Sequence, residues 1–198
     1  MRSLVLSCCV VLMGCASAKE PEAPAKEVPA KEPERRAGVD WPCFLGPAGT
    51  SVSTEKGILT RWPKDGLRVV WSERTGEGYG APSVQGGKLY LFDRIDDKAR
   101  LRCLDAATGK FHWKFEYETN YEDRYSYSNG PRCCPVVDGE RVYLHGSEGM
   151  LYCLRTAGGK PLWKVDTRKD YGMVQNFFGV GSAPVIEDRK STRLNSSH

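Results

Sequence analysis

The sequence has few of the residues that metal centres and phosphate-binding loops require. It contains 3 histidines, and one of them, His198, is the last residue. No two cysteines have the C-x-x-C spacing of a zinc site. The acidic stretch at residues 93–97 reads as a turn, and it lacks the ligand spacing and the bidentate glutamate of a calcium loop. The glycine-rich stretch at residues 76–80 precedes an expected strand and not a helix, which excludes a nucleotide-binding loop.

A surplus of positive charge and a long apolar run are also lacking. The formal net charge is +4, and no basic cluster stands out, so no nucleic-acid partner is expected. The apolar run at residues 4–13 is too short to span a bilayer and is typical of the core of a signal peptide. No later segment keeps a 3.6-residue apolar period, so helices are not expected in the folded region.

Both ends of the chain are expected to lie outside the fold. Residues 1–18 read as a signal peptide with a lipobox, because "LMGC" resembles the bacterial motif in which the cysteine is lipidated; Cys15 is then the membrane anchor. Cleavage after "ASA" (residues 16–18), which would give a secreted protein, is the alternative. The Pro/Ala/Lys/Glu tract at residues 19–38 has too little apolar bulk to fold and predicts a disordered tether. Residues 189–198 break the preceding strand pattern and are expected to be a non-native tail on a truncated chain.

An internal repeat organises residues 39–188. Two copies align, with Pro82 matching Pro135 and Trp113 matching Trp163. Each copy reads as four short strands bounded by Gly-Gly, Asp-Gly or Thr-Gly turns, and in the first copy these strands are residues 81–84, 88–92, 101–105 and 110–115. The stretch "GLRVVWSERTG" reads as an isolated fourth strand, and "SAPVIED" begins a third copy. Four-stranded units that repeat about every 50 residues predict an all-β fold, a partial β-propeller of antiparallel blades.

A motif within the repeat resembles one that is known from quinoprotein-type propellers. "CLDAATGKFHW" matches the tryptophan-docking pattern A-x-D-x-x-T-G-x-x-x-W, with cysteine in place of alanine. We expect the Thr-Gly pair to form a tight turn, the aspartate to accept its N–H groups, and the tryptophan to insert between blades. The second copy, "CLRTAGGKPLW", has Arg155 and Gly158 where the pattern has Asp and Thr. The motif residues of the two copies are Cys103, Asp105, Thr108, Gly109, Trp113, Cys153, Gly159 and Trp163.

On these motifs the chain is identified as a fragment of a PQQ-binding-like β-propeller repeat protein of the kind found in planctomycete-type bacteria. The stretches "DWPCFLGPAGTSVSTEKGILTRWP" and "GEGYGAPSVQGGKLYLF" also resemble the opening of this family's propeller. The resemblance implies a quinoprotein alcohol dehydrogenase-like fold and an extracytoplasmic location in the periplasm or cell envelope. A shared fold does not by itself imply a shared activity.

The resemblance leaves two functions open. The favoured one is a non-catalytic binding or scaffold lipoprotein that holds other envelope proteins, as in the propeller lipoprotein of the outer-membrane β-barrel assembly machinery, with no resident cofactor. The alternative is part of an alcohol or sugar dehydrogenase that depends on PQQ and calcium. Cys133 and Cys134 resemble the vicinal pair whose disulfide packs over the quinone in such enzymes, and an oxidising envelope would permit that bond. They also suit a plain interpretation as small residues that open a buried strand. No catalytic residue and no metal ligand is predicted.

A tyrosine-rich segment is the candidate partner surface. "YETNYEDRYSYSN" (residues 117–129) reads as a long loop between blades. Its tyrosines, Tyr117, Tyr121, Tyr125 and Tyr127, would offer aromatic contacts to another protein. The alternative is a loop that packs against its own blade.

Overall fold

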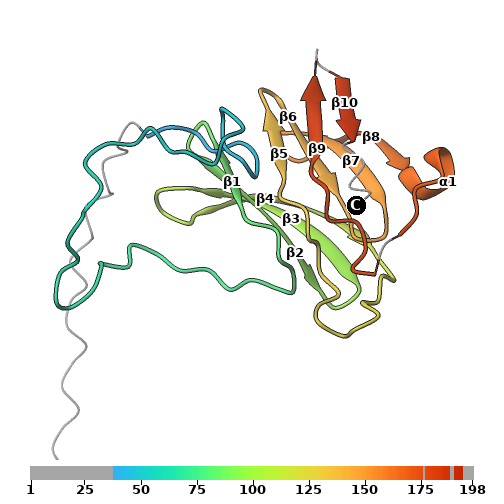
Figure 1. Ribbon diagram of the computed structural model, residues 1–198, viewed down its shortest axis with the longest axis horizontal. Helices are drawn as coiled ribbons and strands as arrows, with labels where there is room; N and C mark the ends of the chain where they lie inside the picture. The colour runs from blue at the N-terminus through green and yellow to red at the C-terminus, as the bar shows by residue number, and fades with distance from the viewer. Residues whose placement is uncertain (1–37, 176, 188–189, 194–198) are drawn as a thin grey trace, which may run out of the picture. The chain divides into compact units, whose positions relative to one another are not determined.

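Two four-stranded antiparallel sheets dominate the computed structural model, which describes residues 38–175, 177–187 and 190–193 (Figure 1). The strands of the first sheet are β1 (Ser83–Gln85), β2 (Lys88–Ile95), β3 (Lys98–Asp105) and β4 (Phe111–Glu118). Those of the second are β5 (Val136–Asp138), β6 (Arg141–His145), β7 (Met150–Arg155) and β8 (Pro161–Asp166). Strand order follows chain order in both sheets, so each is a meander of consecutive hairpins. The predicted all-β architecture of four-stranded antiparallel blades is confirmed.

The β2–β3 hairpin is longer than its sequence pattern predicts. The residues expected to form a wide turn continue the ladder instead, with Asp93 opposite Arg100 and Ile95 opposite Lys98. The turn itself is reduced to two residues, and Asp96 adopts a left-handed φ of 51°. Opposite charges placed directly across the ladder stabilise strand pairing, which explains why a charged stretch is strand here.

A buried ion network lies at this hairpin and fixes the segment that precedes the first sheet. The Asp93 carboxylate accepts hydrogen bonds from Arg100 at 2.8 and 2.9 Å and from Arg102 at 3.0 Å. The Gly76 N–H donates to the same carboxylate at 2.9 Å, and Arg102 also pairs with Glu73. Burial alone would raise the pKa of Asp93, but the hydrogen bonds and the two guanidinium charges together lower it.

The rest of the described chain flanks the two sheets. The segment at residues 66–76, expected to be an isolated fourth strand, forms no strand pairing among the described residues. At the other end, β9 (Pro184–Glu187) begins the third copy and pairs antiparallel with β10 (Lys190–Arg193), which falls within the predicted tail. Whether residues 189–198 are native to the protein stays a prediction. The signal peptide, Cys15 and nearly all of the tether lie outside the described residues.

A five-residue helix, α1 (Thr167–Tyr171), was not expected from the sequence. The Asp166 side chain caps it by accepting the N–H groups of Arg168 and Lys169, and Gly172 ends it with a φ of 62°. The helix is too short to show an apolar period, so capping residues were its only signal. Nowhere in the described ranges is there a helix long and apolar enough to cross a membrane.

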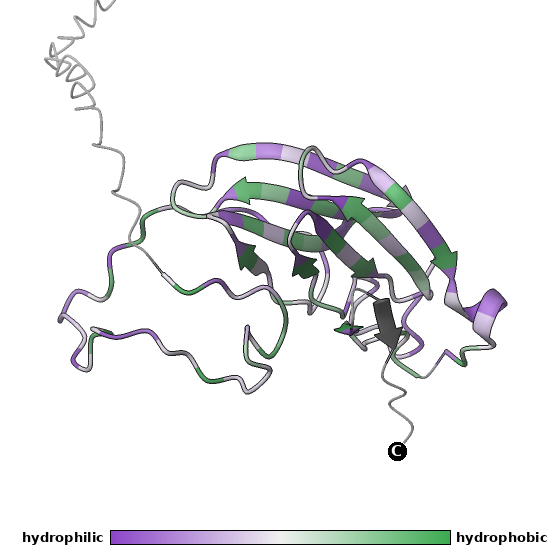
Figure 2. Ribbon diagram, turned by 90° about the horizontal axis from the view of Figure 1, so that it is seen from above, coloured by the Kyte–Doolittle hydropathy of each residue, from purple (hydrophilic) through white to green (hydrophobic). Residues whose placement is uncertain are grey.

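The main core lies between the two sheets. Phe92 and Leu101 of the first sheet and Val142, Leu144 and Leu154 of the second belong to one buried cluster. Tyr152 joins it from β7, with its ring centroid 5.2 Å from that of Phe115. Hydrophobic and hydrophilic residues are interspersed along the strands in Figure 2. The first sheet therefore buries one face against its neighbour, as stacked blades do.

Candidate functional site

The first docking-motif turn is organised by Asp105. Its Oδ1 atom accepts hydrogen bonds from the N–H groups of Ala107 at 3.1 Å and Thr108 at 3.0 Å, and from the Thr108 hydroxyl at 2.9 Å. Gly109 follows with a φ of 73°, a conformation that glycine adopts without strain. In the second copy Arg155 supplies no such carboxylate, yet Gly159 keeps a φ of 69° and its N–H still donates to the Arg155 carbonyl at 3.1 Å.

Each of two tryptophans lies on the turn of the blade that follows it. The Trp113 indole N–H donates to the Thr156 carbonyl at 3.0 Å, and a Cβ added at Gly159 would lie 2.4 Å from the Trp113 ring. Trp71 repeats this arrangement one blade earlier: its indole N–H donates to the Ala106 carbonyl at 3.2 Å. A Cβ at Gly109 would lie 2.8 Å from the Trp71 ring. The segment before the first sheet therefore makes the same side-chain contact as a complete fourth strand.

The small residue of each motif lies directly across from its tryptophan. Cys103 is opposite Trp113, and Cys153 is opposite Trp163, and each cysteine is followed by a register shift. Both cysteines are fully buried. Trp163 is partly exposed, and its ring centroid lies 6.0 Å from that of Tyr143.

Cys133 and Cys134 are buried thiols that lie just before β5, with Pro135 between the pair and the strand. Their exposed fractions are 0% and 5%, and neither forms a disulfide. The Cys133 thiol donates to the Cys134 carbonyl at 3.0 Å, and burial raises the pKa of Cys133 to about 12. A Cβ at Gly80 would lie 2.4 Å from the Cys133 carbonyl oxygen, so the backbone of the first blade packs directly on the pair. In this arrangement the pair offers no open face on which a planar quinone would stack.

The four predicted surface tyrosines fall into two groups, which corrects the sequence interpretation. Tyr121 is 3% exposed, and a Cβ added at Gly179 would lie 2.8 Å from its ring, so it belongs to the interior. Tyr117 lies against Tyr152 with ring centroids 4.6 Å apart, and its hydroxyl donates to Glu148 at 2.9 Å. Burial raises the pKa of Tyr117 well above its usual value. Tyr117 is a residue of β4 and not of the loop, and both tyrosines present little surface to a partner.

Tyr125 and Tyr127 are exposed and join a cluster of aromatic side chains. Their exposed fractions are 50% and 68%, and their ring centroids lie 6.3 Å apart. The Phe178 ring lies 5.6 Å from Tyr125 and 6.2 Å from Tyr127. The Arg132 guanidinium lies over two further rings, with its Cζ atom 5.5 Å from the centroid of Phe178 and 5.2 Å from that of Tyr79. We call this surface the aromatic ledge; its rings are Tyr79, Tyr125, Tyr127, Phe177 and Phe178.

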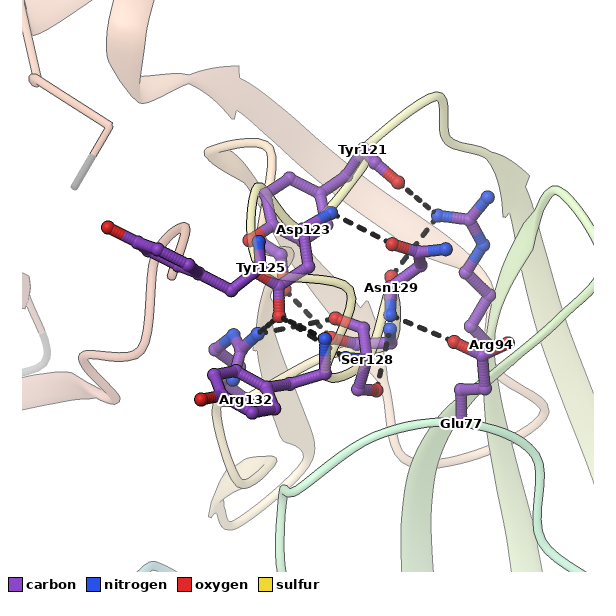
Figure 3. Close-up of polar contacts among 11 residues, drawn as sticks. Glu77, Arg94, Tyr121, Asp123, Tyr125, Ser128, Asn129 and Arg132 are labelled. Carbon is purple, nitrogen blue, oxygen red and sulfur yellow. Dashed lines mark hydrogen bonds and ion pairs between the residues drawn. The ribbon is translucent and has the colours of Figure 1, made fainter. Parts of the chain in front are cut away.

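The carboxylate of Asp123 fixes the loop that carries the ledge (Figure 3). It accepts the N–H groups of Tyr125 at 3.0 Å and of Tyr127 and Ser128 at 3.2 Å, and it pairs with Arg132 at 2.7 Å. The hydrogen bond from the Tyr125 N–H and the other contacts outweigh burial and lower the pKa of Asp123.

Both sheets hold this loop in place. The Asn129 N–H donates to Glu77 at 2.8 Å, and Arg94 of β2 donates to the carbonyls of Tyr121 at 2.6 Å and Asn129 at 3.1 Å (Figure 3). From the second sheet's side, the Ser147 hydroxyl donates to the Gly130 carbonyl at 3.0 Å. The conformation of the loop is therefore set before any partner binds.

A polar hollow of about 370 Å³ adjoins the ledge. Glu122 is exposed, and no described residue donates a hydrogen bond or forms an ion pair with its carboxylate. Tyr127 belongs to both the hollow and the ledge. The residues that line the hollow are Glu77, Glu122, Asp123, Ser126, Tyr127, Ser128 and Asn129. Within the described part of the chain, no three His, Cys, Asp or Glu side chains are grouped to hold a metal ion.

Several residues of this site were not predicted. Asp123 had one local signal, since an aspartate before a run of Ser, Asn and Gly is typical of a side-chain-capped turn. Tyr79, Phe177 and Phe178 had none, because they reach the loop from segments distant in sequence.

Comparison with known proteins agrees with the fold. A family profile described as "Outer membrane protein assembly factor BamB" matches residues 35–187, whereas no curated protein matches the chain. The quinohemoprotein alcohol dehydrogenase from Comamonas testosteroni is 22% identical with a TM-score of 0.54, over 77% of this chain and 22% of that chain. A europium-containing methanol dehydrogenase is 20% identical with a TM-score of 0.44, over 61% of this chain and 21% of that chain.

The two kinds of match carry different weight. At this identity the alcohol dehydrogenase shows a common fold alone, and this chain spans 22% of its length. The family match extends over both sheets, both docking-motif turns and the loop between them. The chain therefore belongs to the PQQ-like β-propeller repeat family that is described as outer membrane protein assembly factor BamB.

Proposed function

We propose that the protein is a non-catalytic binding module of the bacterial cell envelope, an extracytoplasmic lipoprotein anchored through Cys15 that holds partner proteins. The observation that carries the proposal is the aromatic ledge. It brings the exposed rings of Tyr125 and Tyr127, on a loop whose backbone is already fixed by Asp123, next to the exposed ring of Phe178.

Exposed rings in contact with one another favour a role in binding. Single exposed apolar residues are ordinary, but clustered ones on a folded surface are typical of interaction sites. Tyrosine and arginine are enriched among the residues that dominate binding energy, and both occur in and beside the ledge. Because the loop is ordered in advance by both sheets, binding would cost less conformational entropy than ordering a flexible segment.

The family and the leader support the proposed location. The matching profile is described as an outer membrane assembly factor, which supports an envelope protein with protein partners. The lipobox-like "LMGC" and the Pro/Ala/Lys/Glu tract support a domain held away from a membrane by a tether. Labelling with a radioactive fatty acid tests this: incorporation is expected in the native protein and should be lost in Cys15→Ser, and equal labelling of both would contradict the anchor.

The alternative is part of a PQQ- and calcium-dependent alcohol or sugar dehydrogenase. The adjacent cysteines Cys133 and Cys134 before β5 favour it. PQQ would supply the electron acceptor for alcohol oxidation. The burial of both thiols and the close approach of Gly80 argue against a quinone stacked on this pair. Titration with PQQ and calcium is expected to give no spectral change and no dye-linked alcohol oxidation. Alcohol oxidation would establish the enzyme, whereas a spectral change without it would show only that PQQ binds.

Site-specific photocrosslinking in the living bacterium tests the binding function. A benzophenone amino acid at Tyr125 or Tyr127 should crosslink to envelope proteins upon irradiation. Phe111 is a matched control, because it is a similarly exposed aromatic residue on β4, outside the ledge. Absence of crosslinks at both ledge positions, or the same pattern at Phe111, would overturn the proposal.

A further inference from the structure

We propose that the aromatic ledge and the adjoining hollow bind one extended peptide segment of a partner protein. A lysine or arginine side chain of that segment enters the hollow, and an apolar or proline residue beside it packs on the ledge. This inference rests on the proposed binding function and adds the chemistry of the partner.

The ledge supplies the apolar half of the site. Tyr125, Tyr127 and Phe178 form a triangle of rings with centroids 5.6 to 6.3 Å apart. Arginines already lie over other rings of the ledge: Arg132 over Tyr79 and Phe178, and Arg124 over Phe177. No described cation lies over Tyr125 or Tyr127, so these two rings have faces available to a ligand.

The hollow supplies the charged half. Asp123 is buried there, and its charge is balanced by Arg132 and by backbone N–H groups. Glu77 accepts one hydrogen bond, from the Asn129 N–H, and no described cation pairs with Glu77 or Glu122. The hollow therefore keeps two uncompensated carboxylates beside the ring of Tyr127. It repels acidic and phosphorylated ligands and is complementary to a cation.

The shape favours a long basic side chain over a small ion. A hollow of about 370 Å³ is far larger than a bound cation needs, and the described residues group no metal-binding set there. The alkyl stems of lysine and arginine pack on apolar surface while the charged head reaches polar groups. Tyr127 can contact the alkyl stem, or the cation itself over the face of its ring.

The two halves are joined in a way that requires a peptide and not a free amine. Tyr127 is shared by the hollow and the ledge, so a ligand that fills both must extend past this ring. An extended chain rises about 3.3 Å per residue and points alternate side chains to the same face, so side chains two residues apart lie about 6.6 Å from each other along the axis. One of them can enter the hollow while the other packs on the ledge.

Selection from a random peptide library displayed on phage tests the inference with the intact protein. The expected result is enrichment of peptides in which lysine or arginine lies within a few residues of an apolar residue or proline. Affinity of an enriched peptide, measured by fluorescence polarisation, should fall roughly 2- to 30-fold in Glu77→Gln/Glu122→Gln, as expected for two exposed ion pairs. It should fall further in Tyr127→Ala. Glu140→Gln removes an exposed carboxylate of the β5–β6 turn and should have no effect.

The outcomes separate this inference from the proposed function. Enriched peptides that need Tyr125 and Tyr127 but show no basic preference, or that bind Glu77→Gln/Glu122→Gln unchanged, overturn the inference and leave the binding function in place. Peptides that bind the Tyr127→Ala protein equally well overturn the ledge as the site, and photocrosslinking then decides the function. A protein that dimerises, and becomes monomeric in Tyr127→Ala, identifies a second copy as the occupant and overturns the peptide.

Discussion

At the scale of single residues, close contacts between tryptophan and glycine join one blade to the next. Gly158 and Gly159 are neighbours in the same turn and both have a left-handed φ, of 80° and 69°. A Cβ at Gly158 would meet nothing within 4 Å, whereas one at Gly159 would lie 2.4 Å from Trp113. Gly158 is therefore favoured by its backbone conformation alone, whereas Gly159 is favoured both by its backbone conformation and by the close approach of the Trp113 ring.

We predict that the two alanine substitutions differ sharply in stability. Gly158→Ala should lower the free energy of unfolding by about 1–2 kcal/mol, the cost of a left-handed alanine. Gly159→Ala should cost about 2–5 kcal/mol, because displacement of the Trp113 ring adds an overpacking cost of about 1–3 kcal/mol. Urea unfolding of both variants measures the difference. In a Trp113→Ala background the two substitutions should become similar; a difference that persists there would show that the ring contact is not its cause.

The cysteine pair makes a second prediction at this scale. With a pKa of about 12, Cys133 would be ionised in only about one molecule in 10⁴ at pH 8, and it is buried as well. Iodoacetamide should therefore modify the partly exposed Cys43 long before Cys133 in the native protein, as read by peptide mass spectrometry. Urea should abolish the difference. Rapid native labelling of Cys133, or a peptide lighter by two hydrogens from a Cys133–Cys134 disulfide, would restore the cofactor-facing interpretation of the pair.

At the scale of elements, the loop between the sheets depends on an ionised carboxylate. The lowered pKa of Asp123 means that the folded state binds its proton less readily than the unfolded chain does. Its contribution to stability is therefore complete above the ordinary value of 3.8 and is lost as the pH falls through the lower folded value.

We predict that acid loosens this loop before it unfolds the sheets. Hydrogen-exchange protection of the Tyr125, Tyr127 and Ser128 amides should be constant at neutral pH and fall once the pH drops below 3.8. Amides in the β2–β3 ladder are the internal reference. Asp123→Asn should show weak protection of the loop at every pH. Equal protection of the loop in Asp123→Asn and in the native protein at neutral pH would mean that the Asp123 carboxylate does not hold the loop.

What the sequence predicts at this scale depends on whether the signal is local. Turn glycines and apolar runs locate most strands to within a few residues: the predicted 88–92 became Lys88–Ile95, and 110–115 became Phe111–Glu118. The extension of β2 was missed because Asp93 and Arg100 look like exposed turn residues until their pairing is known. The tyrosines show the same dependence on distance along the chain. Tyr125 and Tyr127 lie in a segment whose composition already indicates a loop, whereas the burial of Tyr121 depends on Gly179, which is far along the chain.

At the scale of the whole molecule, the two blades share one core. Leu144 of β6 is fully buried in the cluster that also contains Phe92 and Leu101 of the first sheet. The contact of Trp113 with Gly159, its hydrogen bond to the Thr156 carbonyl, and the loop hydrogen bonds from Arg94 and Ser147 add further links between the sheets. In a repeat architecture, stability is the sum of unit stabilities and interface energies. An interface this continuous should make the two blades unfold together.

We therefore predict that damage to the core from one blade destabilises both. Leu144→Ala should lower the free energy of unfolding by about 2–5 kcal/mol. Because Leu144 belongs to the cluster that the two sheets share, hydrogen exchange of the β2 and β3 amides should accelerate by about the same factor as that of the β6 and β7 amides. Hydrogen exchange read by mass spectrometry measures this. Leu162→Ala is the control, because Leu162 is partly exposed on β8 and lies outside the shared cluster; it should leave exchange in the first blade unchanged. If faster exchange in Leu144→Ala were confined to β5–β8, the blades would be independent units, and the ledge would then rest on two bodies able to separate when a partner binds.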